Sequence, residues 1–535
     1  MCSSDLPDGL DYHNINIHLN LIMWQYLLLI TALLVLSPIL AVLFKCIMSK
    51  INLRYYERQG LKTYFFPFIG FFGVYSKSLK ENQNKSNLNF LRAAVDRDPD
   101  SAGFAVNQVR DSGSILLLHN AEYIKEFFRV EDQFIKQSFT DIYSAATSFV
   151  FMNGEEAMNL KRLVSGLFKY ENLSKYTPVL SKMIAETLRK IAVEKMINSR
   201  EYVQVDVESI LNPVFEIVLS VMVHGRTDLP KIKGISLLEF IRVNSRIFEG
   251  VLRHPLFALM PWFFERFQIL PVQKKLTSEY AVFCKFIEGL VKERENEQNL
   301  GDCVLDHMIL HNRQCKESGN MQDYISLEMI QGTVNVMQLA ATESAQSTST
   351  LSICLMTDRP DLQQAFDGIN SRVYDSAGVT DSSKLDADNI LDLWTKEALR
   401  LCTSASNINP RIAKHDVKIK DITVRAGDGI IIIPDHATKM KAQSFDDPDV
   451  FKIDRFAKKI DRNILQYQYM PFSAGKRACP GWNLGELMVK LAVSQFCRLF
   501  EFRRPDGIEY YVDKQFVNTI TNPVIEIRLK AHIDG

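Results

Sequence analysis

The chain has 535 residues, and its 63 lysine and arginine residues are balanced by 63 aspartate and glutamate residues. This balance leaves no global positive field, so we expect no nucleic-acid partner. The nine cysteines are scattered, odd in number and without a C-x-x-C pair, which argues against a disulfide framework or a zinc ribbon and favours a reducing compartment.

The first predicted element is an apolar segment from Leu21 to Phe44, which contains 24 residues and no charge. As a helix it would be about 36 Å long, enough to cross the ~30 Å hydrocarbon core of a bilayer. Residues 1–20 contain no lysine or arginine, unlike the start of a signal peptide, whereas five basic residues lie between positions 45 and 62. We therefore expect a transmembrane anchor at 21–44, with residues 1–20 luminal and the rest of the chain cytosolic.

A linker and a large globular domain follow the anchor. Residues 45–70 are basic and aromatic, and Pro67 and Gly70 interrupt any helix, so this segment is expected to be a hinge linker. Residues 71–535 have the sequence pattern of a folded globular domain, and we expect them to form the catalytic domain. Within it, the stretch from Leu252 to Leu270 is aromatic and broken by prolines. Two interpretations of this stretch remain open, a segment dipping into the bilayer and ordinary core packing.

Several segments of the domain are predicted to form helices. Residues 153–168 predict an amphipathic helix, and residues 212–225 predict a core helix. Ser326 is a suitable N-cap for a long helix whose middle, residues 340–344, reads Ala-Ala-Thr-Glu-Ser. In a helix over 393–401, Glu397 and Arg400 are three residues apart and can pair on one face. A small sheet is expected between residues 417 and 433.

The most specific pattern lies near the C-terminus, where residues 471–481 read PFSAGKRACPG. Glycine permits tight turns and close backbone approach, so amides of such a loop can point at the sulfur of Cys479. A thiolate held in this way is able to donate to haem iron. The alternative interpretation is a buried structural cysteine in a Gly-Pro turn. An amphipathic helix follows the loop, and a strand is expected from Val524.

Five residues of this loop match, at every fixed position, the haem-ligand signature Phe-x-x-Gly-x-Arg-x-Cys-x-Gly of the cytochrome P450 family. They are Phe472, Gly475, Arg477, Cys479 and Gly481. The chain resembles that family over roughly residues 71–529. The resemblance implies a mainly α (α+β) fold, a helix-rich triangular domain with small β-sheets, and haem b whose iron is bound by Cys479.

The resemblance also implies roles for residues elsewhere in the chain. Arg477, Arg411 and either Arg162 or Lys161 would face the haem propionates, and Ala341 would let the haem approach the long helix. Ala157 stands where the family usually has a tryptophan at the haem edge, which leaves one propionate partner open.

Two further sets of residues match the family by order and spacing. Glu343 and Ser344 occupy the positions of the acid and the hydroxyl that deliver protons, with serine where threonine is usual. Glu397, Arg400 and Arg455 would form a structural network behind the haem.

The function implied is that of a single-pass monooxygenase of the endoplasmic reticulum membrane. It would take electrons from NADPH through a flavoprotein reductase, with cytochrome b5 as a further candidate donor, and hydroxylate a small apolar substrate of lipid, sterol, fatty-acid or terpenoid type. The alternatives are an isomerase or dehydratase acting on a lipid hydroperoxide or endoperoxide, and a catalytically silent haem-binding protein. The candidate reductase-docking residues, for which ordinary solvation is the alternative, are Lys476, Lys161, Arg162, Lys458 and Lys459.

Overall fold

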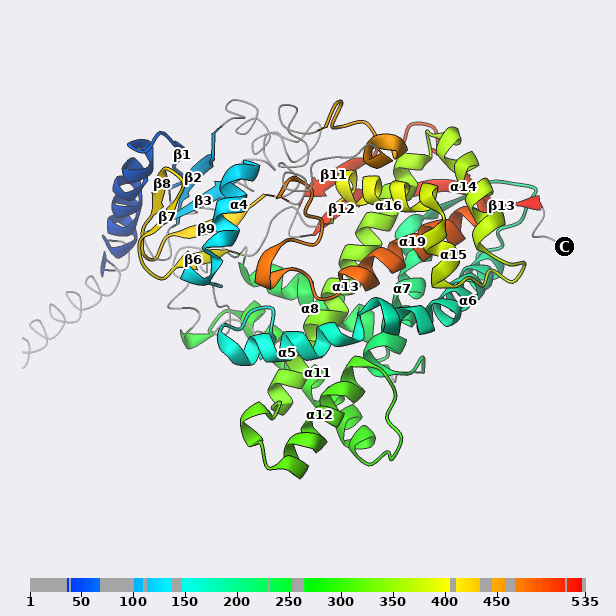
Figure 1. The fold of residues 1–535 in the computed structure, drawn as a ribbon, viewed down its shortest axis with the longest axis horizontal. Helices are drawn as coiled ribbons and strands as arrows, with labels where there is room; N and C mark the ends of the chain where they lie inside the picture. The colour runs from blue at the N-terminus through cyan, green and yellow to red at the C-terminus, as the bar shows by residue number, and fades with distance from the viewer. Residues whose placement is uncertain are drawn as a thin grey trace, which may run out of the picture.

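The structure is a computed structural model that describes residues 36–37, 40–67, 101–108, 113–136, 147–228, 231–252, 254, 264, 266–404, 410–433, 445–457, 467–514 and 517–531. Helices form the larger part of the molecule, and the main sheet lies at one end (Figure 1). The predicted mainly α (α+β) class is therefore confirmed. The labelled helices are α4 (Ala121–Arg129), α5 (Gly154–Leu167), α6 (Tyr170–Glu194), α7 (Val207–His224), α8 (Leu237–Leu252), α11 (Pro271–Glu295), α12 (Val304–Ser318), α13 (Leu327–Met356), α14 (Pro360–Val373), α15 (Ser382–Ala387), α16 (Asn389–Leu401) and α19 (Trp482–Leu499).

The main sheet has six strands in the order β1-β2-β3-β9-β6-β4. These strands are β1 (Lys62–Tyr64), β2 (Gly103–Asn107), β3 (Ser114–Leu118), β4 (Phe134–Lys136), β6 (Arg411–Ala413) and β9 (Gly429–Ile432). At the edge of this sheet, the antiparallel register of β4 and β6 pairs Lys136 with Arg411. The smaller sheets are β10-β13-β5 (Phe500–Arg503, Val524–Leu529, Val203–Asp206), the hairpin β11-β12 (Tyr511–Lys514, Asn518–Thr521) and the hairpin β7-β8 (Val417–Ile419, Ile422–Val424).

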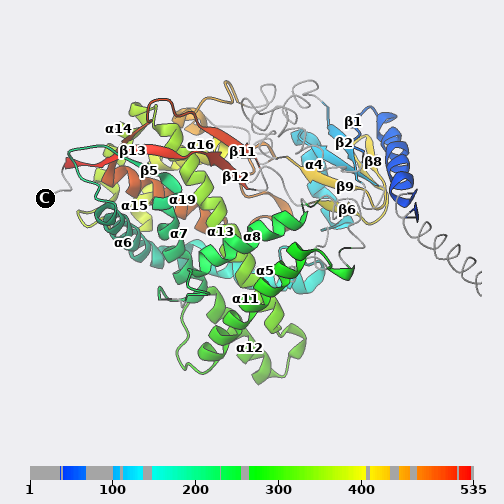
Figure 2. The same cartoon turned by 180° about the vertical axis from the view of Figure 1, so that it is seen from behind.

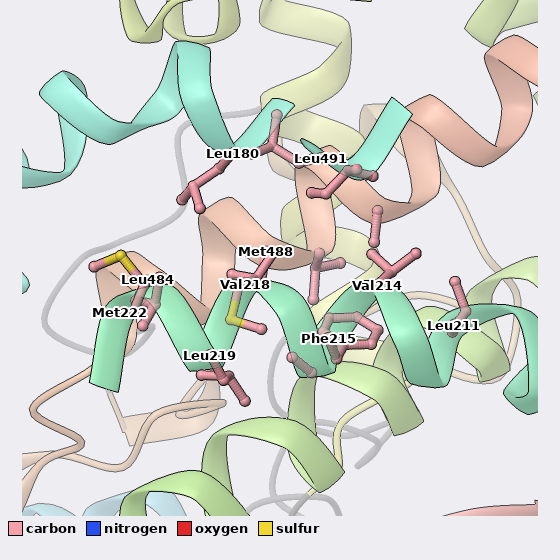
Figure 3. Close-up of a cluster of buried hydrophobic side chains, with 14 of the residues drawn as sticks. Leu180, Leu211, Val214, Phe215, Val218, Leu219, Met222, Leu484, Met488 and Leu491 are labelled. Atoms are coloured by element: carbon pink, nitrogen blue, oxygen red, sulfur yellow. The ribbon is translucent and has the colours of Figure 1, made fainter. Parts of the chain in front are cut away.

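The centre of the helical part is α7. The Asp206 side chain caps its first turn by accepting from the Ser209 amide at 3.0 Å, and Gly225 ends it with a φ of +72°. Apolar side chains of α7 meet those of α6 and α19 in one continuous cluster (Figure 3); the labelled members are Leu180, Leu211, Val214, Phe215, Val218, Leu219, Met222, Leu484, Met488 and Leu491. Of the described helices, α7 alone is long and apolar enough to cross a membrane. Its packing identifies it as the core helix expected at 212–225.

Helix α13 crosses the molecule beside α7 and carries the expected acid and hydroxyl, Glu343 and Ser344. It begins as expected, because the hydroxyl of Ser326 accepts from the amide of Met329 at 3.2 Å. Its 30 residues run through the interior and pack against α7, α8 and α19. Because α19 starts directly after the Cys479 loop, this packing brings the middle of the chain next to its C-terminal part.

An unlabelled helix, which we call the N-terminal helix, comprises residues 40–57. Residues 45–57 were expected to be linker, but they are helical and one side of them is buried, with Leu53 at 2% and Tyr56 at 0% exposure. The linker prediction was based on the basic and aromatic composition and on Pro67 and Gly70, which lie beyond the end of this helix. Residues 21–35 of the expected anchor, and residues 255–263 of the aromatic stretch, lie outside the described residues.

Candidate active site

Backbone hydrogen bonds close the Cys479 loop. The Cys479 amide donates to the Phe472 carbonyl at 2.9 Å, and the amide of Ala478 donates to the carbonyl of Gly475 at 3.1 Å. Gly475 has a φ of +70°, and a Cβ there would lie 2.6 Å from a carboxylate oxygen of Glu131. Glycine is therefore required at position 475 both by its backbone conformation and by the space available.

Gly481 contributes in a different way from the one expected. Its φ is −99°, and a Cβ there would meet only a ring carbon of Phe168 at 3.9 Å, so neither strain nor crowding demands glycine. Its amide instead acts on the sulfur of Cys479 so as to lower the pKa of that thiol. This is the electrostatic effect expected of a loop amide near the sulfur.

The Cys479 sulfur lies in a recess. The side chain is exposed, whereas the other described cysteines are buried or half-buried. Protein nevertheless surrounds it closely enough that burial raises the pKa of the thiol, while the Gly481 amide and the charge of Lys161 act in the opposite direction. A side chain that is both accessible and deeply surrounded faces an internal opening, where a thiolate has room to bind a ligand.

Four basic side chains converge beside this loop: Lys136, Lys161, Arg411 and Arg477. Burial is the largest cause that lowers the pKa of Lys136 to about 6, and the charges of the other three lower it further. The pKa of Arg411 is lowered to about 10, first by burial and then by Arg477. The charge of Glu131 acts in the opposite direction, raising the pKa of Arg411 and of Arg477. Burial and mutual repulsion thus act together on these basic side chains, and the cluster fits an anionic group with more than one charge.

Lys136 was not expected from the sequence. Its ammonium donates to the Val150 carbonyl at 2.5 Å, and its backbone amide and carbonyl are both bonded to the side chain of Asn153, at 2.8 and 3.0 Å. Asn153, which precedes α5, thus connects that helix to β4. No local motif marks Lys136, because only the pairing of β4 with β6 brings it to Arg411.

The two cationic candidates on α5 are placed differently. Lys161 donates to the carbonyl of Lys476 at 2.7 Å and is attracted by Cys479. Arg162 is exposed and donates to Asn159 on its own helix at 2.6 Å. The structure thus brings Lys161 into the cluster and leaves Arg162 on the surface. Ala157, in the position of the family's tryptophan, is fully buried.

The middle of α13 has an opening beside it. Ala340 is exposed and Ala341 and Ser344 are half-buried, although most residues of this helix are buried. The Ser344 hydroxyl donates to the carbonyl of Ala340 at 2.6 Å, a contact that competes with the helix's own hydrogen bonds. Small side chains at this point leave space for a flat ligand against the helix.

Glu343 has a neighbour that the sequence did not indicate. Arg242 on α8 donates a hydrogen bond to Gln346, which lies three residues after Glu343 on the same face of α13. Burial lowers the pKa of Arg242, and the Glu343 carboxylate is the largest opposing charge. Arg242 therefore holds the acid of α13 electrostatically from a neighbouring helix.

The expected network of Glu397, Arg400 and Arg455 is present, and its charged groups all have hydrogen-bond partners. The two guanidinium groups donate to the Glu397 carboxylate at 2.8 to 3.0 Å, and the amide of Lys452 donates to it at 3.0 Å. The glutamate and arginine side chains are at most 5% exposed. Remaining donors of Arg400 and Arg455 reach backbone carbonyls, including that of Pro448 at 2.6 Å. The network fixes residues 446–455 against α16.

These features fit a haem. Cys479 would hold the iron, the four cations Lys136, Lys161, Arg411 and Arg477 would hold the two propionates, and the small residues of α13 would lie against the ring. Among the described residues there is no group of three or more His, Cys, Asp and Glu side chains that could hold a metal ion. Lys458 and Lys459 lie outside the described residues.

Comparison with known proteins agrees with this geometry. The family model described as Cytochrome P450 matches residues 110–527. The chain is 25% identical to "Probable cytochrome P450 4aa1" of Drosophila melanogaster over 65% of this chain and 67% of that protein. It is 22% identical to "Cytochrome P450 72A68" of Medicago truncatula over 72% and 74% of the two chains. The match to "Cytochrome P450 81D1" of Arabidopsis thaliana, 25% identical, spans 45% of this chain and about half of that protein, 46%.

The fold is also similar to a solved structure. The crystal structure of a mutant cytochrome P450DA heme domain aligns with a TM-score of 0.68, at 16% identity, over 85% of this chain and 95% of that chain. At this identity the likeness concerns the fold. Together with the family-model match and the cysteine loop, it shows that the chain belongs to the cytochrome P450 family, a family of haem-thiolate oxidoreductases.

Proposed function

We propose that this protein is a haem-thiolate monooxygenase that hydroxylates a small apolar substrate, using O2 and electrons from NADPH delivered by a flavoprotein reductase. The observation that carries the proposal is the accessible Cys479 sulfur in a recess beside a cluster of four basic side chains. Haem bound there would supply the binding and activation of oxygen, which no side chain provides.

The residues around the sulfur have two tasks. The Gly481 amide and the Lys161 ammonium favour the negative charge of the thiolate. Lys136, Arg411 and Arg477 bind carboxylates and so orient the ring, while their own charges are neutralised in return.

Glu343 and Ser344 provide a route for protons. A serine hydroxyl both donates and accepts, so Ser344 is able to pass a proton onward while its oxygen remains beside the Ala340 carbonyl. Glu343, half-buried and held by Arg242, is able to exchange protons with solvent. Oxygen reduction consumes protons, whereas rearrangement of a hydroperoxide needs none. The presence of both groups therefore favours the monooxygenase over an isomerase or dehydratase.

The segments around α13 support an enclosed substrate site. The hydroxyl of Ser347 donates to the backbone carbonyl of Asn518, and the Asn518 side chain donates to the Thr403 carbonyl at 2.7 Å. Strand β12 and residues 403–404 are thereby fastened to α13 one turn beyond Ser344. Such an enclosure would favour an apolar substrate, because the desolvation of polar groups is costly.

The proposed location is the endoplasmic reticulum membrane, with one transmembrane segment and the catalytic domain in the cytosol. The charge-free residues 21–44, followed by basic residues, support this orientation. Protease treatment of sealed microsomes should digest the C-terminal domain, and its protection would overturn the orientation.

The ligand assignment is tested with the carbon monoxide complex of the reduced protein. Cys479→His should abolish its red-shifted Soret band, whereas Cys402→Ala, which changes a buried cysteine outside the loop, should keep it. Persistence of the band in Cys479→His would assign the iron to another residue.

The reaction type is tested by turnover. Purified protein with reductase should consume NADPH and form a hydroxylated product from a panel of sterols, fatty acids and terpenoids. Turnover of a lipid hydroperoxide without NADPH would replace this proposal with the isomerase, and haem binding with neither activity would indicate a silent protein.

A further inference from the structure

The N-terminal helix exposes a stripe of large apolar side chains. Its members are Leu40, Leu43, Phe44, Ile47 and Ile51, which are 61%, 42%, 63%, 58% and 48% exposed. They are spaced three, one, three and four residues apart, so they lie on one face of the helix. Isolated surface hydrophobics are common in proteins, but a continuous helical stripe of this kind marks an interaction surface.

The same face changes character further along the helix. Arg54 and Arg58 follow Ile51 at helical spacing, and both are exposed. The outward face therefore passes from five apolar residues, with Lys50 exposed at their edge, to two basic ones, which is the order in which a helix leaves hydrocarbon and reaches anionic headgroups.

The opposite face of the helix is attached to the catalytic domain. The Tyr56 hydroxyl donates to Asp428 at 2.6 Å, and the same carboxylate accepts from the amide of Ser114 at 2.7 Å. Arg425 lies over the ring of Tyr55 at 4.5 Å. Ser49 donates to the carbonyl of Gln108 at 3.0 Å.

These contacts reach two parts of the sheet region. Asp428 and Arg425 lie between β8 and β9, while Gln108 follows β2 and Ser114 begins β3. The helix, drawn in blue, lies beside β7 and β8 at the sheet end in both views (Figures 1 and 2). The inner face is thus held by buried polar contacts as well as by packing.

We propose that the apolar stripe is embedded in the lipid bilayer, so that the sheet end of the catalytic domain is mounted rigidly on the membrane instead of being joined to its anchor by a hinge. This inference rests on the proposed membrane attachment. Lipid is the occupant because the first three members of the stripe lie in the charge-free segment 21–44, and Ile47 and Ile51 extend it past Lys45 and Lys50, whose long side chains can reach the headgroups. From Leu40 to Ile51 the helix rises about 16 Å, roughly half of a hydrocarbon core.

The mounting has a geometric consequence. Residues 46–56 contact lipid on one side and the sheet on the other, so this edge of the domain must lie at the bilayer surface. The orientation of the Cys479 recess relative to the membrane is then set by protein contacts and not by chance rotation about a linker.

The occupant is identified by photo-crosslinking on the full chain in phosphatidylcholine vesicles. A benzoylphenylalanine placed at Ile47 or Ile51 should form acyl-chain adducts in a yield roughly tenfold above that of the same group at Val193, an exposed residue at the end of α6. Crosslinked dimers at Ile47 would assign the stripe to a second copy of this chain. Absence of any adduct there would show a solvent-exposed face, and either result overturns the inference.

The rigidity is tested separately. Tyr56→Phe keeps the ring but removes the hydroxyl that Asp428 accepts, and folding is monitored by circular dichroism. In oriented bilayers the linear dichroism of the haem should be strong in the unchanged protein and clearly weaker in Tyr56→Phe. Equal dichroism in both would overturn the role of this contact in the mounting.

Different results would contradict the membrane attachment and the embedding of the stripe. If the unchanged chain is released from membranes by alkaline carbonate, the membrane attachment itself is wrong. If it stays bound but position 47 yields no lipid adduct, only the embedded stripe is wrong.

Discussion

Lys136 and Arg411 are register partners on β4 and β6, so the pairing of the edge strand β4 with β6 places two buried basic side chains side by side. After burial, Arg411 is the largest cause of the lowered pKa of Lys136. A fold gains no stability from this repulsion in the absence of an anion. We therefore propose that carboxylates of the cofactor bind here and balance the charge of these side chains.

The first prediction concerns the haem-free protein. Lys136 has a pKa of about 6 when folded and about 10.4 when unfolded, so between these values the unfolded chain binds the additional proton. Stability should consequently rise with pH from about 6 to about 10, and Lys136→Met should remove this part of the slope. At pH 7 the free energy of unfolding of the variant should be about 1–3 kcal/mol higher than that of the unchanged protein. Denaturant titrations of the haem-free protein at several pH values measure this.

The same substitution should have the reverse effect on the cofactor. Without the Lys136 ammonium, haem should transfer faster to an acceptor globin, because one partner of a carboxylate is lost. Lys414→Met is the matched control, since Lys414 is an exposed lysine directly after β6. If the Lys136→Met variant lost haem no faster than the unchanged protein does, Lys136 would not be part of the haem site.

The second prediction concerns Glu397. Glu397→Ala leaves two buried guanidinium groups without their carboxylate, so the free energy of unfolding should fall by about 3–5 kcal/mol. Lys182→Ala, which breaks an exposed pair with Glu186, should cost at most about 1 kcal/mol. Chemical denaturation of both variants gives the comparison. Similar losses in the two would show that the network is structurally unimportant.

Local signals predicted much of the fold. The start of α13 at Ser326, the helix after the cysteine loop and the strand from Val524 are all present. Each depends on nearby residues, through capping, helical periodicity or alternation. The network of Glu397, Arg400 and Arg455 was also expected, because family spacing marks it.

Long-range contacts were not predictable in the same way. Lys136 reaches the site through strand register, and Arg242 reaches Glu343 through the packing of α8 on α13. The basic and aromatic composition, with Pro67 and Gly70 downstream, predicts a linker over residues 45–57, whereas burial of Tyr56 depends on Asp428, far away in sequence. One sequence does not show which distant segments will meet.

The third prediction concerns the reductase. Arg162 is exposed, whereas Lys161 is engaged with the Lys476 carbonyl and the Lys476 side chain is paired with Asp132. Among the three candidate docking residues that the structure describes, Arg162 is therefore the one best placed to meet an acidic partner. Arg162→Glu should slow haem reduction several-fold at low salt and flatten its dependence on ionic strength. Arg200→Glu, which reverses an exposed charge beyond α6, is the control. Equal rates for both variants in stopped-flow reduction would exclude this docking residue.

The fourth prediction concerns proton delivery by Ser344. Ser344→Ala should lower product per NADPH and raise hydrogen peroxide release, because no hydroxyl remains at this point of α13. Ser344→Thr should preserve or improve the coupling, since the extra methyl restricts the rotamers of the hydroxyl. Product, NADPH and peroxide are measured in the same reaction. Unchanged coupling in Ser344→Ala would remove this hydroxyl from the proton route.

The fifth prediction separates Glu343 from the residue that holds it. If Arg242 acts only by positioning the Glu343 carboxylate, Arg242→Gln and Glu343→Gln should each reduce product per NADPH, and the double variant should be no worse than Glu343→Gln alone. The pH profile of coupling should shift in Arg242→Gln, because a positive charge that interacts with the carboxylate is lost, but not in Arg246→Gln, which changes an exposed arginine one turn along α8. Additive losses would instead assign Arg242 an independent role, such as holding α8 against α13 through Gln346.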